Sequence, residues 1–281
     1  MTWLNTSVHS GFARSASEAM FPRLFPDAGW WCPSLNPAMG GTRLWDLSGR
    51  QNWSTLTNTE SSDWVVNAGK GALDLDGVNE YSVTNASYFS AATIRGFSVS
   101  MWMRTTATNS NAYLFSLGSS ASDSPIIGFR IDPGGNGSLV AFLRDNAGTF
   151  FIPGSTSAAD AVNNGNWNFI VLTIDGATAQ VRVNGSNYGT AATITTLGAT
   201  TINRATIGAL GRTGFASYYS GQLDDIRIYN RALSAGEVRQ LWQIGRGNMP
   251  LRRRRRYTEQ AAGGFKGYWT NRQHLIGSGV Y

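Results

Sequence analysis

The pattern of apolar and polar positions changes along the chain. From about residue 97 it alternates with period two: in residues 97–104 every second side chain from Phe97 to Met103 is apolar, as one face of a half-buried β-strand requires. Glycine, asparagine and aspartate clusters, such as those at 132–137 and 163–166, separate this run from later ones. The later runs are 112–117, 126–131, 138–144, 167–174, 179–184, 201–208 and 223–229. Short strands at this spacing predict an antiparallel sandwich.

One helix is predicted after the last strand. Ser234 and Glu237 have the spacing of a capping box, in which the serine oxygen accepts from a free backbone N–H and the glutamate reaches back to the cap. Gly245 and Gly247 are expected to end this helix. An apolar stripe that can pack onto the sandwich lies between these signals and consists of Val238, Leu241 and Trp242.

The net charge of +6 resides at one end of the chain. The last 31 residues carry seven basic side chains and one acidic side chain, Glu259, whereas the first 250 residues carry 16 of each sign. Residues 1–28 precede any sandwich signal, and residues 248–281 follow the predicted helix. We therefore predict an N-terminal arm (1–29), a β-sandwich (30–247) and an Arg-rich C-terminal anchoring tail (248–281).

Three stretches resemble laminin-G-type, concanavalin A-like lectin/glucanase domains. They are Asp-Leu-Ser-Gly at 46–49 followed by Asn52 and Leu-Thr-Asn at 56–58, Gly-Ala-Leu-Asp-Leu-Asp-Gly at 71–77 with Tyr81, and the segment 221–234. With the strand at 97–104 and the hairpin at 167–185, the resemblance covers about residues 30–245. It implies an all-β, antiparallel jelly-roll β-sandwich with one short C-terminal helix. The tail is similar to extensions on such domains in tailed-phage and prophage-like bacterial proteins.

The family's fold includes glycoside hydrolases, but the sequence does not favour an enzyme. Retaining glycosidases need two carboxylates about 5 Å apart, and none of the five glutamates has the Glu-x-Asp-x-x-Glu-like spacing of the glucanases with this fold. The two histidines, His9 and His274, lie in the predicted arms, where they cannot build a triad or a multi-histidine metal site. The single cysteine, Cys32, allows no intrachain disulfide. No 18-residue apolar run occurs, so we expect no transmembrane helix.

Two kinds of binding site have candidate residues. In this family, aspartates near positions such as Asp74, Asp76 and Asp225 sometimes help to bind Ca²⁺, which prefers six to eight oxygen ligands. The alternative is that these aspartates accept from backbone N–H groups at strand ends or pair with Arg227 or Arg231. We expect no cofactor other than this possible Ca²⁺. Aromatic rings that could stack on a sugar are also present, with packing in the core or a subunit interface as the alternative. These rings belong to Tyr218 and Tyr219 in a Gly/Ser-rich loop, followed by Trp53 and Tyr88.

The arginine run of the tail has three interpretations. It could be a nucleic-acid clamp with about five phosphate contacts, a nuclear localisation signal, or an anchor that forms bidentate pairs with carboxylates of a neighbouring subunit. We favour the anchor, because apolar groups beyond the run would otherwise be exposed to water. The predicted anchoring residues are Arg252, Arg253, Arg254, Arg255, Arg256, Phe265, Tyr268, Trp269, Arg272, Leu275 and Ile276.

These features predict a non-enzymatic virion structural protein on the particle surface. Its most concrete form is a phage capsid decoration (cement) protein, held by its arms on other virion proteins such as the major capsid protein. We expect a homo-oligomer, and we expect neither a membrane nor a nucleic-acid partner. The alternatives are a tail or baseplate structural protein and a carbohydrate-binding module for host-surface adsorption, which would bind glycans.

Overall fold

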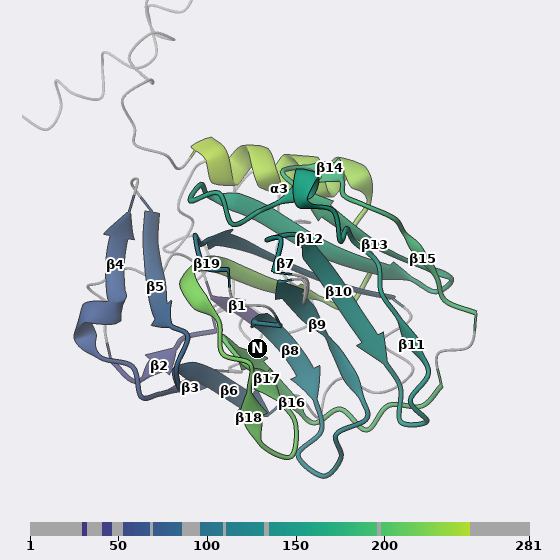
Figure 1. Cartoon of the computed structure of the whole chain (residues 1–281), viewed down its shortest axis with the longest axis horizontal. Helices are drawn as coiled ribbons and strands as arrows, with labels where there is room; N and C mark the ends of the chain where they lie inside the picture. Colours follow the sequence, from purple (N-terminus) through teal and green to yellow (C-terminus); the bar gives the residue numbers. More distant parts are fainter. Residues whose placement is uncertain are drawn as a thin grey trace, which may run out of the picture.

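The structure is a computed structural model, and it describes residues 30–32, 41–46, 53–67, 70–85, 96–108, 111–131, 135–195 and 198–247. Most of both predicted arms, including all of 248–281, lies outside the described residues. The described chain forms two antiparallel sheets packed face to face, with one helix on the outside (Figure 1). The predicted all-β jelly-roll sandwich is therefore confirmed.

Within the described residues the larger sheet has nine strands. Its main path runs β14 (Ser186–Asn187), β13 (Thr178–Val183), β12 (Asn168–Asp175), β7 (Gly96–Arg104), β19 (Ser220–Tyr229), β5 (Lys70–Asp76) and β4 (Trp64–Asn67). Two further strands pair beside this path: β1 (Trp30–Cys32) with β19, and β15 (Ala192–Thr193) with β13.

The second sheet has eight strands among the described residues. Its order is β11 (Phe150–Phe151), β10 (Leu139–Arg144), β9 (Ile126–Ile131), β8 (Tyr113–Gly118), β16 (Arg204–Ile207), β6 (Tyr81–Asn85), β3 (Ser54–Thr57) and β2 (Arg43–Leu44). A hairpin of β17 (Leu210–Gly211) and β18 (Phe215–Ala216) and two short 3₁₀ turns, η3 (Ser61–Asp63) and η5 (Ala158–Asp160), complete the β-rich part.

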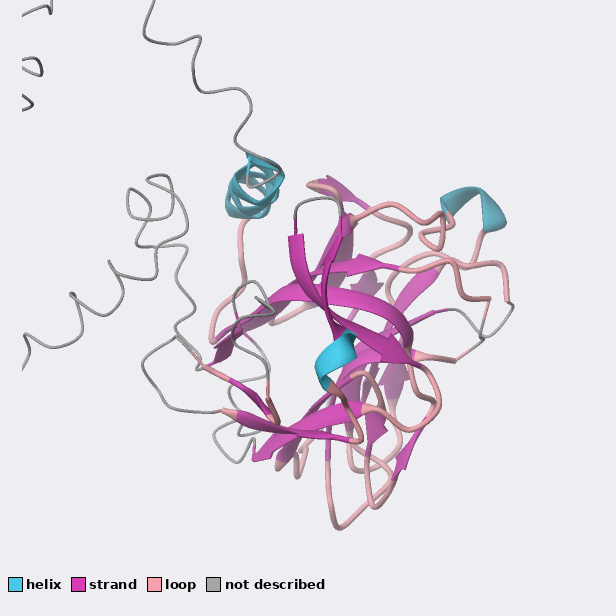
Figure 2. Cartoon of the chain, turned by 90° about the vertical axis from the view of Figure 1, so that its left-hand side faces the viewer, coloured by secondary structure: helices cyan, strands magenta, loops and turns pink. Residues whose placement is uncertain are grey.

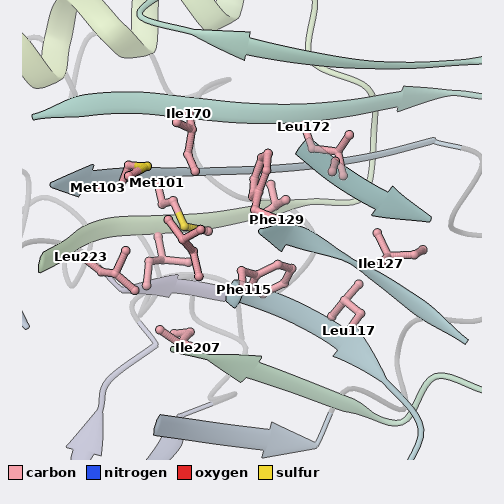
Figure 3. Close-up of a cluster of buried hydrophobic side chains, with 14 of the residues drawn as sticks. Met101, Met103, Phe115, Leu117, Ile127, Phe129, Ile170, Leu172, Ile207 and Leu223 are labelled. Atoms are coloured by element: carbon pink, nitrogen blue, oxygen red, sulfur yellow. The ribbon is translucent and has the colours of Figure 1, made fainter. Parts of the chain in front are cut away.

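The main core lies between the two sheets. Apolar side chains at alternate positions of β7 and β12, such as Met101 and Ile170, face Phe115 and Phe129 of the second sheet (Figure 3). These four residues are buried to 2% exposure or less. Burying a side chain of this size contributes about 1.5–3 kcal/mol, so the repeated alternation of the strands is enough to hold the layers together.

All eight predicted strand runs form strands, but β7 differs from the expected half-buried strand. Its second face, which carries Ser98, Ser100 and Trp102, is buried as well. The reason is a second apolar cluster outside the larger sheet, where Trp102 packs with Phe169 and with the helix residue Leu241. A strand covered on both faces is typical of a sheet that lies between a core and a helix.

The outer cluster is covered by helix α3 (Ala235–Gly247), which Figure 2 shows outside the two layers. Its predicted capping box is present: the Glu237 backbone N–H donates to Ser234 Oγ at 3.3 Å, and the Ser234 N–H donates to Glu237 Oε2 at 2.9 Å. Of the two glycines predicted to end the helix, Gly247 is its last residue, whereas α3 continues through Gly245. A Cβ at Gly245 would lie 2.5 Å from the Trp102 ring, so this glycine allows close packing. No helix in the described ranges has the length and apolar character for a membrane crossing.

Candidate functional site

Two exposed tryptophans lie on the outer face of the eight-stranded sheet. β2 and β3 pair through Arg43 with Thr55 and through Leu44 with Ser54. Leu44 and Ser54 point into the core, where both are fully buried. Because side chains alternate along a strand, the next position places Trp45 opposite Trp53 on the outer face. We call this arrangement the tryptophan pair.

The tryptophan pair remains accessible even though both side chains are large and apolar. Trp45 is 44% exposed and Trp53 is 42% exposed. Their ring centroids are 6.1 Å apart with an angle of 65° between the ring planes. The guanidinium carbon of Arg43 lies 6.0 Å from the Trp53 ring centroid, within the range of a cation–π contact. Thr84 Oγ1 donates to the Trp53 carbonyl at 3.1 Å, which ties this position to β6.

This geometry forms a corner with aromatic walls and a cationic neighbour. One ring can cover the apolar face of a flat ligand, while the second ring, inclined by 65°, contacts the ligand's edge. Exposed apolar groups surrounded by polar residues often mark binding surfaces, and Trp and Tyr combine a large apolar area with a polar tip. Trp53 was among the residues predicted from the sequence, whereas Trp45 was missed. Only the register of β2 against β3 in the folded sheet places Trp45 beside Trp53.

The other predicted sugar-stacking residues are placed differently. Tyr219 was a wrong prediction, because its side chain is only 1% exposed and its hydroxyl donates to the Arg104 carbonyl at 3.2 Å. Burial raises the pKa of the Tyr219 hydroxyl far above its usual range. Tyr218 is half-buried and donates to the Phe215 carbonyl at 3.3 Å. The Tyr218 ring packs against the ring of Tyr81, with centroids 6.2 Å apart. The Tyr81 ring in turn stacks on Phe215 with centroids 4.0 Å apart. Tyr218 therefore helps to pack the β17–β18 hairpin; Tyr88 lies outside the described residues.

The three candidate calcium ligands are not brought together. Asp74 Oδ2 accepts from Gln222 Nε2 at 2.9 Å, and Asp76 Oδ1 accepts from the Val78 backbone N–H at 2.7 Å. Asp225 lies elsewhere, in a separate ion pair. Within the described ranges, no three His, Cys, Asp or Glu side chains form a group that could hold a metal ion. The alternative of backbone and arginine partners holds for Asp76 and Asp225, whereas the partner of Asp74 is a glutamine side chain.

Asp225 occupies an irregularity in β19. The register of β19 against β7 shifts between Asp224 and Arg227, and Asp225 has a φ of 50°. Here β19 stops pairing with β5 and begins to pair with β1. Both oxygens of the Asp225 carboxylate accept from Arg227 at 2.8 Å, and both residues are at least 95% buried. The pair balances two charges that would be costly to bury singly.

One carboxyl group has the shifted pKa that is common in active sites. Burial of Glu80, together with the nearby Asp63 and Asp76 carboxylates, raises its pKa from 4.5 to about 7. Glu80 is however only 6% exposed, and its Oε2 accepts from the Asp76 backbone N–H at 2.6 Å. Glu80 is therefore buried against its own turn, with the Asp63 carboxylate beside it, and is not presented to a ligand as the acid of a glycosidase would be. The arrangement supports a structural role for Glu80.

The predicted anchoring residues cannot be placed. They lie in the tail, which falls outside the described residues, so their role stays a prediction. These residues are Arg252–Arg256 of the arginine run together with Phe265, Tyr268, Trp269, Arg272, Leu275 and Ile276.

Comparisons with solved structures find the same fold in a domain of an extracellular arabinanase and in two domains described as binding or receptor-binding domains. Domain 4 of AbnA, an extracellular arabinanase from Geobacillus stearothermophilus solved with arabinotriose, superposes with a TM-score of 0.58 at 17% identity, covering 76% of this chain and 99% of that one. The binding domain of Paraclostridial Mosquitocidal Protein 1 gives 0.57 at 18% identity, covering 76% and 52%. The receptor-binding domain of botulinum neurotoxin D gives 0.57 at 15% identity, covering 78% and 53%. This chain thus corresponds to about half of each toxin domain.

Sequence comparison identifies the family. A search among curated proteins finds no significant match. Residues 75–239, more than half of the chain, match the family described as the concanavalin A-like lectin/glucanases superfamily. This segment begins within β5 and ends within α3, so it includes most strands of both sheets and the capping box of the helix. The chain therefore belongs to the concanavalin A-like lectin/glucanase superfamily.

Proposed function

We propose that the sandwich is a non-enzymatic glycan-binding module whose ligand sits on the tryptophan pair. The observation that carries this proposal is the pair of accessible indole rings, each more than 40% exposed, which lie next to each other where the edge strand β2 pairs with β3. A pyranose or furanose ring presents C–H groups on its face and hydroxyls on its rim. The face suits an indole ring, and the rim suits the guanidinium group of Arg43.

The fold relatives add support of a general kind. AbnA domain 4 was solved with arabinotriose, and the two toxin domains are named as binding or receptor-binding domains. Because these proteins are only 15–18% identical to this chain, they show a shared fold alone. The identity of the sugar is therefore not inferred from any of them. The cation–π contact of Arg43 with Trp53 places a positive charge beside the tryptophan pair, which favours a neutral or anionic saccharide.

A glycan array probed with the full chain tests this proposal. We expect binding to a restricted set of saccharides, and loss of that signal in Trp45→Ala and Trp53→Ala. About 100 Å² of each ring is accessible if a tryptophan presents roughly 250 Å² in total, and a ligand that covers half of this removes about 50 Å² per ring from water. At about 25 cal/mol per Å², each substitution weakens binding about eightfold.

Phe150→Ala is the matched control. Phe150 is also aromatic and exposed, at 58%, but it lies on β11 at the opposite edge of the same sheet. Its removal should leave the array profile unchanged. Undiminished glycan binding by the Trp45→Ala/Trp53→Ala double variant would refute the assignment of the site, and an array without any signal would refute the function.

A second proposal concerns the position of the module in a larger particle. We propose that it is displayed on a virion surface, most concretely as a phage capsid decoration protein, through the basic tail. The support is the sequence: all of the excess positive charge follows residue 250, in a segment that also carries aromatic side chains. Deletion of 248–281 should abolish incorporation into particles and leave the sandwich folded. Normal incorporation of the truncated chain would contradict this attachment.

A further inference from the structure

A polar cleft of about 310 Å³ opens on the other side of the molecule, on the outer face of the nine-stranded sheet. Asp74, Gln222 and Arg104 form a row across β5, β19 and β7, because Gln222 pairs with Asp74 on one side and with Arg104 on the other. Their neighbours Leu73 and Leu223 point into the core, so the row faces outward. The row lies just beyond Trp102, which α3 covers.

Hydrogen bonds connect the three side chains of the row, but they do not use all of its donor and acceptor atoms. Gln222 Nε2 donates to Asp74 Oδ2 at 2.9 Å, and Arg104 Nη1 donates to Gln222 Oε1 at 3.2 Å. Arg104 Nε donates to the Gly165 carbonyl at 2.7 Å, which fixes the plane of the guanidinium group. Among the described residues, Asp74 Oδ1 and Arg104 Nη2 have no hydrogen-bond partner. One acceptor and one donor therefore remain at the two ends of a pre-arranged row.

The chemistry of the lining restricts the ligand. One negative and one positive side chain balance, so the cleft does not select a strongly charged ligand, and the lining residues include no aromatic ring on which a sugar face could stack. Asp74 and Arg104 both bond to the one amide group of Gln222, so a ligand that uses both ends of the row needs polar groups at more than one position along its edge. Several hydroxyl groups along one edge of a molecule can span this row. The volume lies at the small end of ligand sites.

We propose that this cleft is a second binding site, which takes the hydroxyl edge of one or two neutral sugar units. A ligand hydroxyl donates to Asp74 Oδ1, and a neighbouring hydroxyl accepts from Arg104 Nη2. This site differs from the tryptophan pair in chemistry and lies on the opposite sheet. It would let one module contact two saccharide chains, or two parts of one branched chain. The proposal does not depend on the tryptophan pair binding glycan.

Titration of the full chain followed by ¹H–¹⁵N NMR tests the proposal. The probes are free arabinose, glucose and galactose at millimolar concentrations, with glycine as a zwitterionic comparison. We expect at least one sugar to shift the side-chain amide of Gln222 and the backbone amides of Gly165 and Gly221. The indole N–H signals of Trp45 and Trp53 report separately on the tryptophan pair, so failure at one site is distinguishable from failure at the other.

Two substitutions on the same strand sharpen the test. Asp74→Asn keeps an acceptor for Gln222 but removes the charge, and we expect it to weaken the cleft's affinity about tenfold, as for loss of one charged hydrogen bond. Asp76→Asn makes the same chemical change at an exposed position two residues away, outside the cleft, and should leave the affinity unchanged. In the Trp45→Ala/Trp53→Ala variant the cleft shifts should persist.

Three results would overturn this assignment. The first is the absence of shifts at the cleft with every sugar. The second is a response to glycine alone, which would indicate a zwitterion site. The third is an equal loss of affinity in Asp74→Asn and Asp76→Asn, which would indicate a general charge effect.

Discussion

Replacing Glu80 by glutamine should change how the stability of this protein depends on pH. The Glu80 side chain is 6% exposed, its Oε2 accepts from the Asp76 backbone N–H at 2.6 Å, and the carboxylates of Asp63 and Asp76 lie nearby. Burial, followed by repulsion from these two acids, raises the pKa of Glu80 from 4.5 to about 7. The folded protein therefore keeps a proton that the unfolded chain has already lost over this range.

The sign and size of the effect follow from this difference. A raised pKa in the folded state contributes stability that is complete below about pH 4.5 and is lost as the pH rises through about 7. The shift from 4.5 to about 7 spans roughly 2.5 pH units, and each unit corresponds to about 1.4 kcal/mol. Glu80 should thus remove up to about 3 kcal/mol from the free energy of unfolding between acidic and mildly alkaline pH.

Glutamine imitates the protonated acid, because its carbonyl oxygen can accept from Asp76 and its amide can donate to Asp63. In urea unfolding, Glu80→Gln should match the wild type near pH 4.5 and exceed it by about 2–3 kcal/mol near pH 8. Glu60→Gln, at an exposed glutamate beside the same turn, controls for the loss of one charge from this acidic region. Parallel stability curves for the wild type and Glu80→Gln would refute the reasoning.

Two further substitutions test packing and charge. Gly245→Ala places a Cβ 2.5 Å from the Trp102 ring and should destabilise the protein by about 1–3 kcal/mol in thermal or urea unfolding. Gly236→Ala in the same helix is the control: the nearest neighbour of its Cβ lies at 3.9 Å, so this change should be neutral or stabilise by up to about 1 kcal/mol. Equal effects of the two substitutions would contradict the close contact between the helix and the Trp102 ring. Asp225→Ala leaves the buried Arg227 without its carboxylate and should cost about 3–5 kcal/mol. Asp123→Asn removes an exposed charge beside Arg212 but keeps an oxygen that can accept from Thr213, so it should change stability little. A similar loss in both variants would argue against the buried pair as the cause.

Much of the fold could be predicted because its signals are local. The alternation in residues 97–104 reflects a strand that faces a core, and the Ser234–Glu237 spacing reflects hydrogen bonds within one turn of helix. The two-residue strands β2 and β11 could not be predicted, because two residues cannot display a period. The role of Gly245 was also hidden, because only the position of Trp102 in the folded sheet explains it.

The sites were less predictable because they depend on contacts between distant segments. Residue type alone suggested Trp53, but its partner Trp45 follows from the register of β2 against β3. Tyr219 resembles an exposed loop residue in the sequence, yet the close approach of Gly221 to the end of β7 encloses its ring; a Cβ on that glycine would lie 2.8 Å from the Tyr219 hydroxyl. The Asp225–Arg227 pair could be proposed from the sequence, as the alternative to calcium binding, because two residues of one strand separated by one position share a face.

The two outer faces of the sandwich show why accessible binding groups remain where they do. On the larger sheet, α3 covers Trp102 and its apolar neighbours, and the cleft residues Asp74 and Arg104 begin one row farther along the strands. On the smaller sheet, the β17–β18 hairpin covers the region around Tyr81 with Phe215, while Trp45 and Trp53 lie beside the edge strand β2 and its neighbour β3. Each cover buries the apolar part of its face. The polar cleft needs no cover, because water can solvate it, but the two exposed indoles gain free energy from contact with another molecule. This difference makes the tryptophan pair the stronger candidate for the principal contact and the cleft the candidate for added selectivity.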